Sequence, residues 1–255
     1  MKQLKLLQLA RDNAKNSKPL RAETEETQAT VYLHGVIGGW WGDIDETQFA
    51  TTLASLDVNE IHLRIDSPGG DVFAARSMMT AISQHKAKVI AHVDGLAASA
   101  ATGICMACDE VEITQGAGFM IHNAWTIAIG NKADMQDTSN LLGKIDAGLV
   151  NDYARRTGRS ADEITAWMDA ETWFTADEAV DNGFADRVVE VVGKRTSNAW
   201  NLSAYQNAPK SAEPAQPNDQ DDETLLVHQN ELELRFSLRA LSDPPSRRVF
   251  HFQRG

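Results

Sequence analysis

The stretch from Lys88 to Cys108 constrains the fold more strongly than any other part of the sequence. It begins with Lys88-Val89-Ile90-Ala91-His92-Val93, a short run rich in apolar and β-branched residues, which predicts a buried strand. Asp94-Gly95 ends this run, and small residues around Ser99 lead into Thr102 to Cys108, which predicts a buried helix. The chain therefore turns from a strand into a helix, with the Ser99 hydroxyl in the turn between alanines.

A serine in such a turn is typical of a nucleophile elbow, where small residues two positions before and after the serine let strand and helix pack closely. Ala97 and Ala101 stand where that motif has glycines, so the pattern is met only in part. The alternative is a lone serine in a helix that packs through small residues. Taken alone, the stretch favours this alternative, and the rest of the chain has to decide.

Strands and helices alternate along much of the sequence, a pattern that predicts βαβ units and a parallel sheet. We expect strands at residues 30–37, 61–65, 88–93, 111–114, 119–122 and 184–192. We expect helices at 45–56, 73–82, 102–108 and 133–157, the last of them capped by Gly158. Two capping boxes, Ser160 with Glu163 and Thr175 with Glu178, predict two further helices.

Composition narrows the class of protein and its partners. The 255 residues suffice for one well-buried domain with an appendage. The net charge of −12 disfavours nucleic acid or an anionic membrane as partner, and no stretch reaches transmembrane length, so we expect a cytoplasmic protein. Cys105 and Cys108 are too few for a disulfide framework or a zinc site. Packing is their expected role, and a redox dithiol is the weaker alternative.

Changes in composition divide the chain into four segments. Residues 1–28 are charged and weakly patterned, which predicts an N-terminal arm, and residues 29–192 form the expected folded domain. Residues 193–223 become rich in Pro, Gln, Asn and Asp, which predicts a linker. In the tail, residues 224–255, Leu232 to Leu238 alternate apolar and polar side chains. A lone strand of this kind is unstable in water, so it either docks on a partner or is disordered.

A glycine-rich loop, Ser67-Pro68-Gly69-Gly70-Asp71, follows one predicted strand and precedes a helix. Paired glycines let backbone N–H groups approach a ligand closely. A phosphate loop is one interpretation, but the Gly-Lys-Ser/Thr ending of that motif is absent. A plain turn is the second interpretation. The third is an oxyanion hole formed by the N–H groups of Gly70 and Ala100.

Among the seven histidines, His122 has the best context for a general base, because it ends an apolar strand and leads into a polar loop. A lone histidine at such a position is more often a hydrogen-bonded core residue. A serine–histidine site also needs a carboxylate that orients the imidazole. Asp169 and Glu171, between two predicted helices, are the candidates, and periodicity does not choose between them.

Together these stretches resemble the proteolytic subunit of the Clp protease family. The matching pieces are Ser67-Pro68-Gly69-Gly70, Gly95-Leu96-Ala97-Ala98-Ser99, Met120-Ile121-His122 and Thr175-Ala176-Asp177-Glu178-Ala179 with Gly183. They occur in the family's order with similar spacing, over about Val31 to Val189. The resemblance implies an α/β fold, a Clp-protease/crotonase-like ββα superhelix, with residues 133–157 as a protruding handle helix.

The resemblance also implies a serine endopeptidase in which Ser99 is the nucleophile and His122 the base. Counting back from Thr175-Ala176 places the acid of the family at Glu171. The family usually has aspartate there, so Asp169 stays the second choice.

The remaining implications concern the oxyanion hole and the assembly. The resemblance assigns the oxyanion hole to the amides of Gly70 and Ala100, and it implies no metal and no cofactor. It implies a homo-oligomer of heptameric rings that enclose a chamber. An AAA+ unfoldase is a candidate partner.

Three features are more similar to the phage head-maturation proteases of this family than to its housekeeping members. They are the Trp40-Trp41 loop, the sequence Glu171-Thr172-Trp173-Phe174 and the long tail. Phage proteases of this kind cleave scaffold and capsid proteins during prohead assembly. The resemblance therefore implies a capsid or scaffold polypeptide as substrate, in the host cytoplasm or the prohead.

Three alternatives remain beside the protease. A crotonase-type acyl-CoA enzyme shares the superhelix and the pair of oxyanion amides, but does not need Ser99 and His122 together. A ring-forming assembly protein with a decayed site stays open as an alternative, because position 171 carries glutamate where the family usually has aspartate. A membrane-linked Ser–Lys peptidase of the same fold is disfavoured by His122 and by the lack of an anchor.

Overall fold

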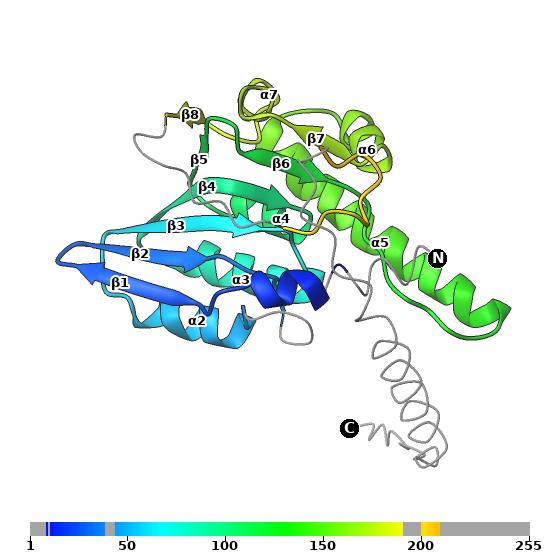
Figure 1. Ribbon diagram of the computed structural model, residues 1–255, viewed down its shortest axis with the longest axis horizontal. Coiled ribbons are helices and arrows are strands. Elements are labelled where there is room, and N and C mark those ends of the chain that lie inside the picture. The colour runs from blue at the N-terminus through cyan, green and yellow to red at the C-terminus, as the bar shows by residue number, and fades with distance from the viewer. Residues whose placement is uncertain (1–8, 10, 39–43, 191–199, 210–255) are drawn as a thin grey trace, which may run out of the picture. The chain divides into compact units, whose positions relative to one another are not determined.

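An eight-stranded mixed sheet organises the part of the chain that the computed structural model describes, namely residue 9 and residues 11–38, 44–190 and 200–209 (Figure 1). The strands are β1 (Arg21–Glu25), β2 (Gln28–Leu33), β3 (Glu60–Ser67), β4 (Lys88–Ala98), β5 (Glu110–Thr114), β6 (Gly118–Ile121), β7 (Thr172–Phe174) and β8 (Arg187–Val189). Their order is β1-β2-β3-β4-β5-β8, and β6 pairs with both β4 and β7. The β1–β2 and β6–β7 pairs are antiparallel, and the others are parallel, as predicted.

The helices follow the predicted ones closely, because local sequence fixes their ends. They are α2 (Glu46–Ser55), α3 (Val72–Gln84), α4 (Ala100–Met106), α5 (Lys132–Thr157), α6 (Ala161–Asp169) and α7 (Ala176–Asp181). Both predicted capping boxes form, at Ser160 and at Thr175. Gly158 ends α5 in the left-handed conformation, with φ 71°, where a residue without a side chain is favoured. Residues 11–16 are helical as well.

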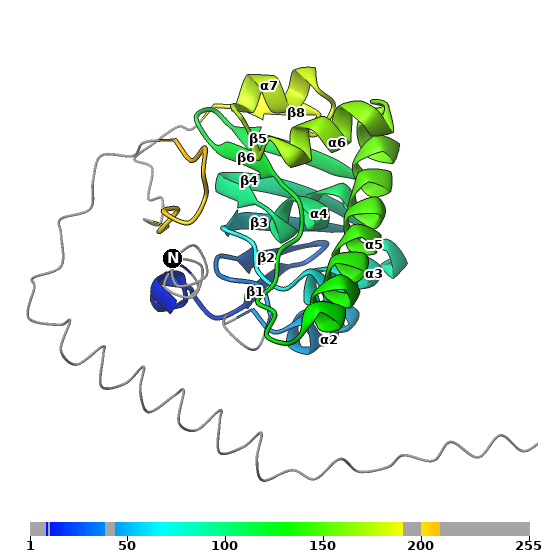
Figure 2. The ribbon, with the colours of Figure 1, turned by 90° about the vertical axis from the view of Figure 1, so that its right-hand side faces the viewer.

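The two faces of the sheet are covered differently, as Figure 2 shows. Helices α2, α3, α4 and α5 lie on one face, and residues 11–16 and 200–209 lie on the other. On the helix side, strand residues such as Val31 and Leu63 are completely buried together with Phe49, Met78 and Ile104. Each such side chain stabilises the fold by roughly 1.5–3 kcal/mol through burial. The hydrophobic core therefore lies between the sheet and these helices.

Polar side chains cover the middle of the strands on the opposite face. His62 Nδ1 lies 2.9 Å from His92 Nε2, and His92 Nδ1 lies 2.8 Å from the carboxylate of Glu112. Arg64 forms a two-pronged ion pair with Asp94 on the neighbouring strand. These cross-strand pairs satisfy the hydrogen-bonding groups of one another's side chains, and they contribute to the stability of the sheet on its polar side.

Strand β4 continues beyond its predicted end. The turn signal Asp94-Gly95 predicted a break, which was wrong, because pairing with neighbouring strands outweighs a local preference. Residues 90–93 of β4 pair with β5, whereas residues 96–98 pair with β6, so β4 stands at a fork in the sheet. The fork places the end of β6 beside the residue that follows β4, which is Ser99.

The described fold is wider than residues 29–192. Residues 21–25 of the expected arm form β1, which pairs with β2. Residues 200–209 of the expected linker pack on the domain, and Ala204 is only 8% exposed. Strand β7, between α6 and α7, was not predicted either. Trp40-Trp41, the rest of the expected linker and the tail at 224–255 lie outside the described residues.

Helix α5 is anchored by its second half only. Its buried residues are Leu149, Val150, Asp152 and Tyr153, all in the C-terminal part. Figure 1 shows the other half extending past the edge of the sheet. Within the ranges described above, no helix is long and apolar enough to cross a membrane.

Candidate active site

Ser99 lies in the turn between β4 and α4, in a conformation uncommon for a residue with a side chain. Its φ is 55° and its ψ is −125°. A left-handed conformation of this kind costs of order 1–3 kcal/mol in a residue other than glycine. The Ser99 amide donates to the Met120 carbonyl at 2.9 Å, and the Ser99 carbonyl accepts from Thr102. A strained serine between strand and helix is the backbone feature of a nucleophile elbow.

The alanines beside Ser99 take the role that glycines have in that motif. Ala97, Ala98 and Ala101 are completely buried, each with 0% of its surface exposed. A larger side chain at these positions has no free space, since protein interiors are packed to nearly crystalline density. Alanine is small enough here for the strand and the helix to meet at a sharp turn.

His122 follows directly after β6, and its imidazole meets the Ser99 hydroxyl. The distance from His122 Nε2 to Ser99 Oγ is 2.8 Å, a normal hydrogen bond. The register of β4 with β6 explains this contact. The two strands are parallel and Ala98 lies opposite Met120, so the residues that follow each strand, Ser99 and His122, leave the sheet at the same end. Two residues far apart in the sequence are thus brought together by one strand pair.

The Ser67–Asp71 loop lies against the same turn. A Cβ atom built on Gly69 would lie 2.8 Å from Ser99 Cβ and 2.7 Å from the Ala98 carbonyl oxygen, so only glycine fits there. On Gly70, a Cβ atom would lie 2.0 Å from the carbonyl oxygen of Ile37. Among the described residues, neither the Gly70 amide nor the Ala100 amide donates a hydrogen bond to another residue. Within the part of the chain that the structure describes, both amides therefore lack an acceptor.

The two candidate acids lie near His122 by different routes. In β6 and β7, Ile121 lies opposite Thr172, and the same register continued by one residue places Glu171 opposite His122. Glu171 is also left-handed, with φ 49°. Its carboxylate accepts from the Asn207 amide at 2.8 Å and from Trp173 Nε1 at 3.4 Å. Residues opposite each other in an antiparallel pair have Cβ atoms about 4.5–5.5 Å apart.

Asp169 lies at the end of α6 and reaches the neighbour of the histidine. Its carboxylate accepts a 2.7 Å hydrogen bond from Asn123 Nδ2. Asp146 on α5 is close by and accepts from the Ala124 amide at 2.7 Å. Burial raises the pKa of Asp146, the bond from Ala124 opposes this, and the charge of Asp169 raises it further. This side of the site is therefore rich in carboxylates.

A pocket of about 260 Å³ lies beside His122 and the two candidate acids. Its lining comprises His122, Asn123, Ala124, Trp125, Met168, Asp169, Glu171, Ala204, Tyr205 and Gln206. The last three belong to the segment 200–209, which the sequence had assigned to a linker. The aromatic residues Trp200 and Tyr205 were the available signal, because a linker of ordinary composition carries few of them.

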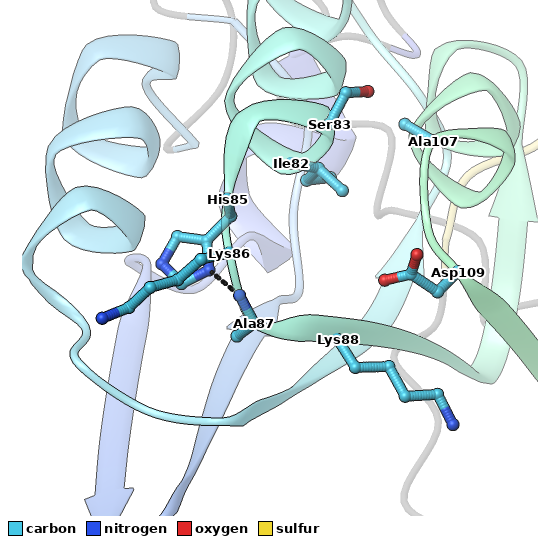
Figure 3. Close-up of a pocket in the computed structure, with 8 residues that line it drawn as sticks. All are labelled: Ile82, Ser83, His85, Lys86, Ala87, Lys88, Ala107 and Asp109. Carbon is cyan, nitrogen blue, oxygen red and sulfur yellow. Dashed lines mark hydrogen bonds between the residues drawn. The ribbon is translucent and has the colours of Figure 1, made fainter.

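A second pocket, of about 410 Å³, lies where α3 ends and β4 begins (Figure 3). It contains none of the predicted site residues. Its two lysines already have carboxylate partners, Lys86 with Asp57 at 2.5 Å and Lys88 with Glu110 at 2.6 Å. Figure 3 shows their ammonium groups pointing in different directions, so they do not converge on one ligand.

Cys105 and Cys108 are both buried in the core, as their expected packing role requires. Burial raises the pKa of the Cys105 thiol to about 12 and the pKa of the Cys108 thiol well above its usual value. Both remain protonated thiols at neutral pH, which makes them poor nucleophiles and metal ligands. Nowhere in the described ranges do three or more His, Cys, Asp or Glu side chains form a group that could hold a metal ion.

Comparisons with known proteins identify the family. The sequence model of the Clp protease family matches residues 45–192, more than half of the chain. ATP-dependent Clp protease proteolytic subunit 3 of Rhodococcus jostii is 27% identical over 176 residues, which cover 68% of this chain and 87% of that protein. ATP-dependent Clp protease proteolytic subunit 1 of Chlamydia abortus is 32% identical over 129 residues, 49% of this chain and 67% of that protein.

A solved structure supports the fold. A variant of ClpP1 from Listeria monocytogenes superposes with a TM-score of 0.57 at 23% identity, over 64% of this chain and 91% of that one. The predicted α/β class and Clp-protease-like architecture are therefore confirmed. The matched segment contains Ser99, His122 and both candidate acids, and it ends before residue 200. From its sequence and its fold, this chain belongs to the Clp protease family.

Proposed function

We propose that this protein is a serine endopeptidase with Ser99 as nucleophile and His122 as general base. One observation carries the proposal: Ser99, held in a strained turn, has its Oγ 2.8 Å from His122 Nε2. A nucleophile and its base need a hydrogen bond of this length. Strain at a functional residue is maintained only where the surrounding structure supports it, and here buried alanines do so.

The proposed reaction is acyl transfer to Ser99 followed by hydrolysis. The Ser99 proton moves to His122 Nε2 while Oγ bonds to the carbonyl carbon of the substrate. When the C–N bond breaks, His122 gives this proton to the leaving amine. Water then repeats the sequence on the Ser99 ester and releases the new carboxylate. Every proton in this scheme is handled by groups of this chain, water or the substrate.

The amides of Gly70 and Ala100 complete the proposed site as the oxyanion hole. Both are available donors, and Gly69 brings the first loop into contact with the Ser99 turn. Donors fixed before the reaction stabilise the negative charge that develops on the carbonyl oxygen. For the acid, the strand register favours Glu171, with Asp169 as the second choice.

We further propose a homo-oligomer of heptameric rings, in which the protruding half of α5 stacks two rings on each other. Large apolar side chains lie exposed on this half and on the segment before it: Ile129 is 96%, Leu141 50% and Met135 39% exposed. Large apolar side chains exposed on a projecting element favour an interaction surface there. An AAA+ unfoldase is a candidate partner, in line with relatives named as subunits of ATP-dependent proteases.

The proposed substrate is a capsid or scaffold polypeptide, processed during phage head maturation. This part of the proposal rests on the sequence of the Trp40-Trp41 loop, on Glu171-Thr172-Trp173-Phe174 and on the long tail. Co-expression with the capsid and scaffold genes of the same genome tests it. Cleavage of either protein that disappears with Ser99→Ala supports the assignment, and intact capsid and scaffold proteins beside an active peptidase contradict it.

Reaction with a fluorophosphonate probe tests the chemistry. We expect the purified protein to be labelled and to hydrolyse unfolded polypeptide, and Ser99→Ala to lose both properties while keeping its oligomeric state. Ser83→Ala, on an exposed position of α3, is the matched control and should behave as the parent protein. Neither a crotonase-type enzyme nor a decayed assembly protein would react in this manner. An unlabelled but folded and assembled parent protein would contradict the proposed function.

A further inference from the structure

Residues 200–209, here called the strap, lie across the candidate active site and contact both of its walls. One wall is the loop with Gly70, and the other is the His122 side of the site. Tyr205 spans them, because its hydroxyl donates to the Pro68 carbonyl at 2.9 Å and its ring packs edge-on against His122, with centroids 5.5 Å apart. Burial, together with the charge of Glu171, raises the pKa of Tyr205, so its hydroxyl stays protonated and able to donate.

The strap covers an apolar patch on the face of the sheet opposite to helices α2, α3, α4 and α5. Leu96, Ala98 and Met120 form a small buried cluster there, separate from the main core. Their cover consists of Trp173 from β7 and three strap residues, Trp200, Leu202 and Tyr205. Next to this patch, the middle of the strands carries the polar pairs of His62 with His92 and of Arg64 with Asp94. The apolar patch lies at the ends of β4 and β6, beside Ser99 and His122.

Polar anchors fix both ends of the strap. At its start, Trp200 Nε1 donates to Asp66 at 2.8 Å, and Asn201 exchanges two hydrogen bonds with Asn13 at 2.6 and 2.9 Å. Near its end, the backbone N–H of Asn207 donates to the Glu171 carboxylate at 2.8 Å, and the side-chain Nδ2 of Asn207 donates to the Ala170 carbonyl at 2.6 Å. Such bonds contribute about 0.5–1.5 kcal/mol each.

We propose that the strap is an intramolecular inhibitor, in which Tyr205 fills the subsite that receives a large apolar side chain of the substrate. This inference rests on the proposed function. A substrate carbonyl must reach Ser99 Oγ with its oxygen near Gly70, and the flanking peptide must then run between the two walls that Tyr205 bridges. Peptide and strap therefore exclude each other, and the protease is closed until the strap leaves.

The energetics follow from competition between strap and substrate. When only a fraction of molecules is open, the apparent affinity for a ligand falls by that fraction. Weakening the strap raises the open fraction without replacing Ser99, His122 or the residues that carry the proposed oxyanion amides. The reaction of Ser99 with a small probe should therefore accelerate. If the strap only supported the fold, or if Tyr205 positioned His122, weakening the strap would instead slow the reaction of Ser99 with the probe.

The experiment compares the rate of fluorophosphonate labelling of Ser99 in the full-length protein and in two variants. Tyr205→Ala should be labelled at least about tenfold faster, since it removes the ring and the hydrogen bond. Tyr205→Phe keeps the ring and loses only the bond to Pro68, so we expect a rise of about threefold to fivefold. Tyr32→Phe, which loses the bond from a tyrosine on β2 to Glu23, is the matched control and should leave the rate unchanged.

A synthetic peptide of residues 200–209 provides the second measurement. Added to the Tyr205→Ala protein, this peptide should slow the labelling towards the rate of the parent protein. A peptide that itself carries the Tyr205→Ala substitution should not slow it. Labelling of both Tyr205 variants at the rate of the parent protein, or more slowly, overturns the inference. If Ser99 of the parent protein is labelled in that case, the proposed function still stands. Unlabelled Ser99 in every folded protein overturns both. Should Tyr205→Ala fail to fold, Tyr205→Phe decides, and the peptides are then added to that variant.

Discussion

Two strand-to-helix turns meet at the candidate active site, and they place different residues in the left-handed conformation. Between β3 and α3 these residues are Gly69 and Gly70, with φ values of 96° and 150°. Between β4 and α4 the residue is Ser99, with φ 55°. Glycine adopts such angles readily, whereas serine does so at a cost in free energy. The same kind of turn is therefore relaxed in the first case and strained in the second.

The difference indicates what each turn supplies. The first turn brings backbone into close contact with Ile37 and with the Ser99 turn, and the Gly70 amide donates to no acceptor among the described residues. The second turn points a hydroxyl at His122. Glu171, opposite His122 by strand register, is also left-handed without being glycine. Among the described non-glycine residues with positive φ, Ser99 and Glu171 are proposed catalytic side chains, whereas Glu26 lies in the turn between β1 and β2. The proposed amide donor Gly70, in contrast, is a glycine, which takes its φ without strain.

Removing the imidazole gives the largest expected effect, because the strained serine then lacks its base. We expect His122→Ala to lower the kcat for peptide hydrolysis roughly 10⁴–10⁶-fold with little change in KM. His85→Gln, at the end of α3 and outside the site, is the matched control. Steady-state kinetics on one peptide measure both. Substantial activity in His122→Ala would show that the Ser99 turn is strained for another reason.

Replacing each candidate acid by its isosteric amide distinguishes Glu171 from Asp169 as the residue that orients His122. We expect Glu171→Gln to reduce kcat by up to about 10⁴-fold, because an amide cannot hold the productive tautomer of the imidazole. Asp169→Asn should cost less than about tenfold, since its described hydrogen bond goes to Asn123. Parallel kinetics of the two variants decide the assignment. The reverse order of effects would transfer the role to Asp169 and break the link between left-handed strain and catalysis.

The glycine turn is tested by adding one methyl group. In Gly70→Ala the new Cβ meets the Ile37 carbonyl at 2.0 Å, so the loop must move and the amide loses its position. We expect kcat to fall about 10²–10³-fold, together with a lower melting temperature. Gly143→Ala on α5, where a Cβ has no neighbour within 4 Å, should instead stabilise by up to about 1 kcal/mol. A fully active Gly70→Ala would remove this loop from the oxyanion hole.

The smallest effect concerns the strain itself. We expect Ser99→Gly to be more stable than Ser99→Ala by about 1 kcal/mol, because glycine takes φ 55° without strain. Urea unfolding of both inactive variants measures this difference. Equal stability would mean that Ser99 is not strained, and the contrast between the two turns would lose its energetic basis.

Local signals in the sequence predicted most helices and the central strands. The capping boxes at Ser160 and Thr175 and the left-handed cap at Gly158 depend on a few neighbouring residues, so they are visible without a structure. Strand β1 was missed because all of its residues are exposed, which leaves no apolar alternation to detect. The end of β4 was missed because sheet pairing outweighs the Asp94-Gly95 turn signal.

For the candidate site, the sequence indicated residues but not the contacts between them. Small residues around Ser99 and the strand-end position of His122 made both side chains candidates, but their roles were assigned only through the resemblance to the Clp protease family. Their distance depends on the register of β4 with β6, which no local pattern encodes. The strap was missed because Pro, Asn and Ser around it predict a linker, whereas Trp200, Leu202 and Tyr205 pack on a patch that only the fold creates. Long-range pairing therefore accounts for what the sequence did not reveal.

Peptide mapping of the fluorophosphonate-treated protein by mass spectrometry tests the central claim most directly, namely that the Ser99 hydroxyl is activated by His122. We predict a single phosphonate adduct, on the peptide that contains Ser99, and its disappearance in folded His122→Ala. An adduct on another serine, or an adduct on Ser99 that forms equally fast without His122, would contradict the account.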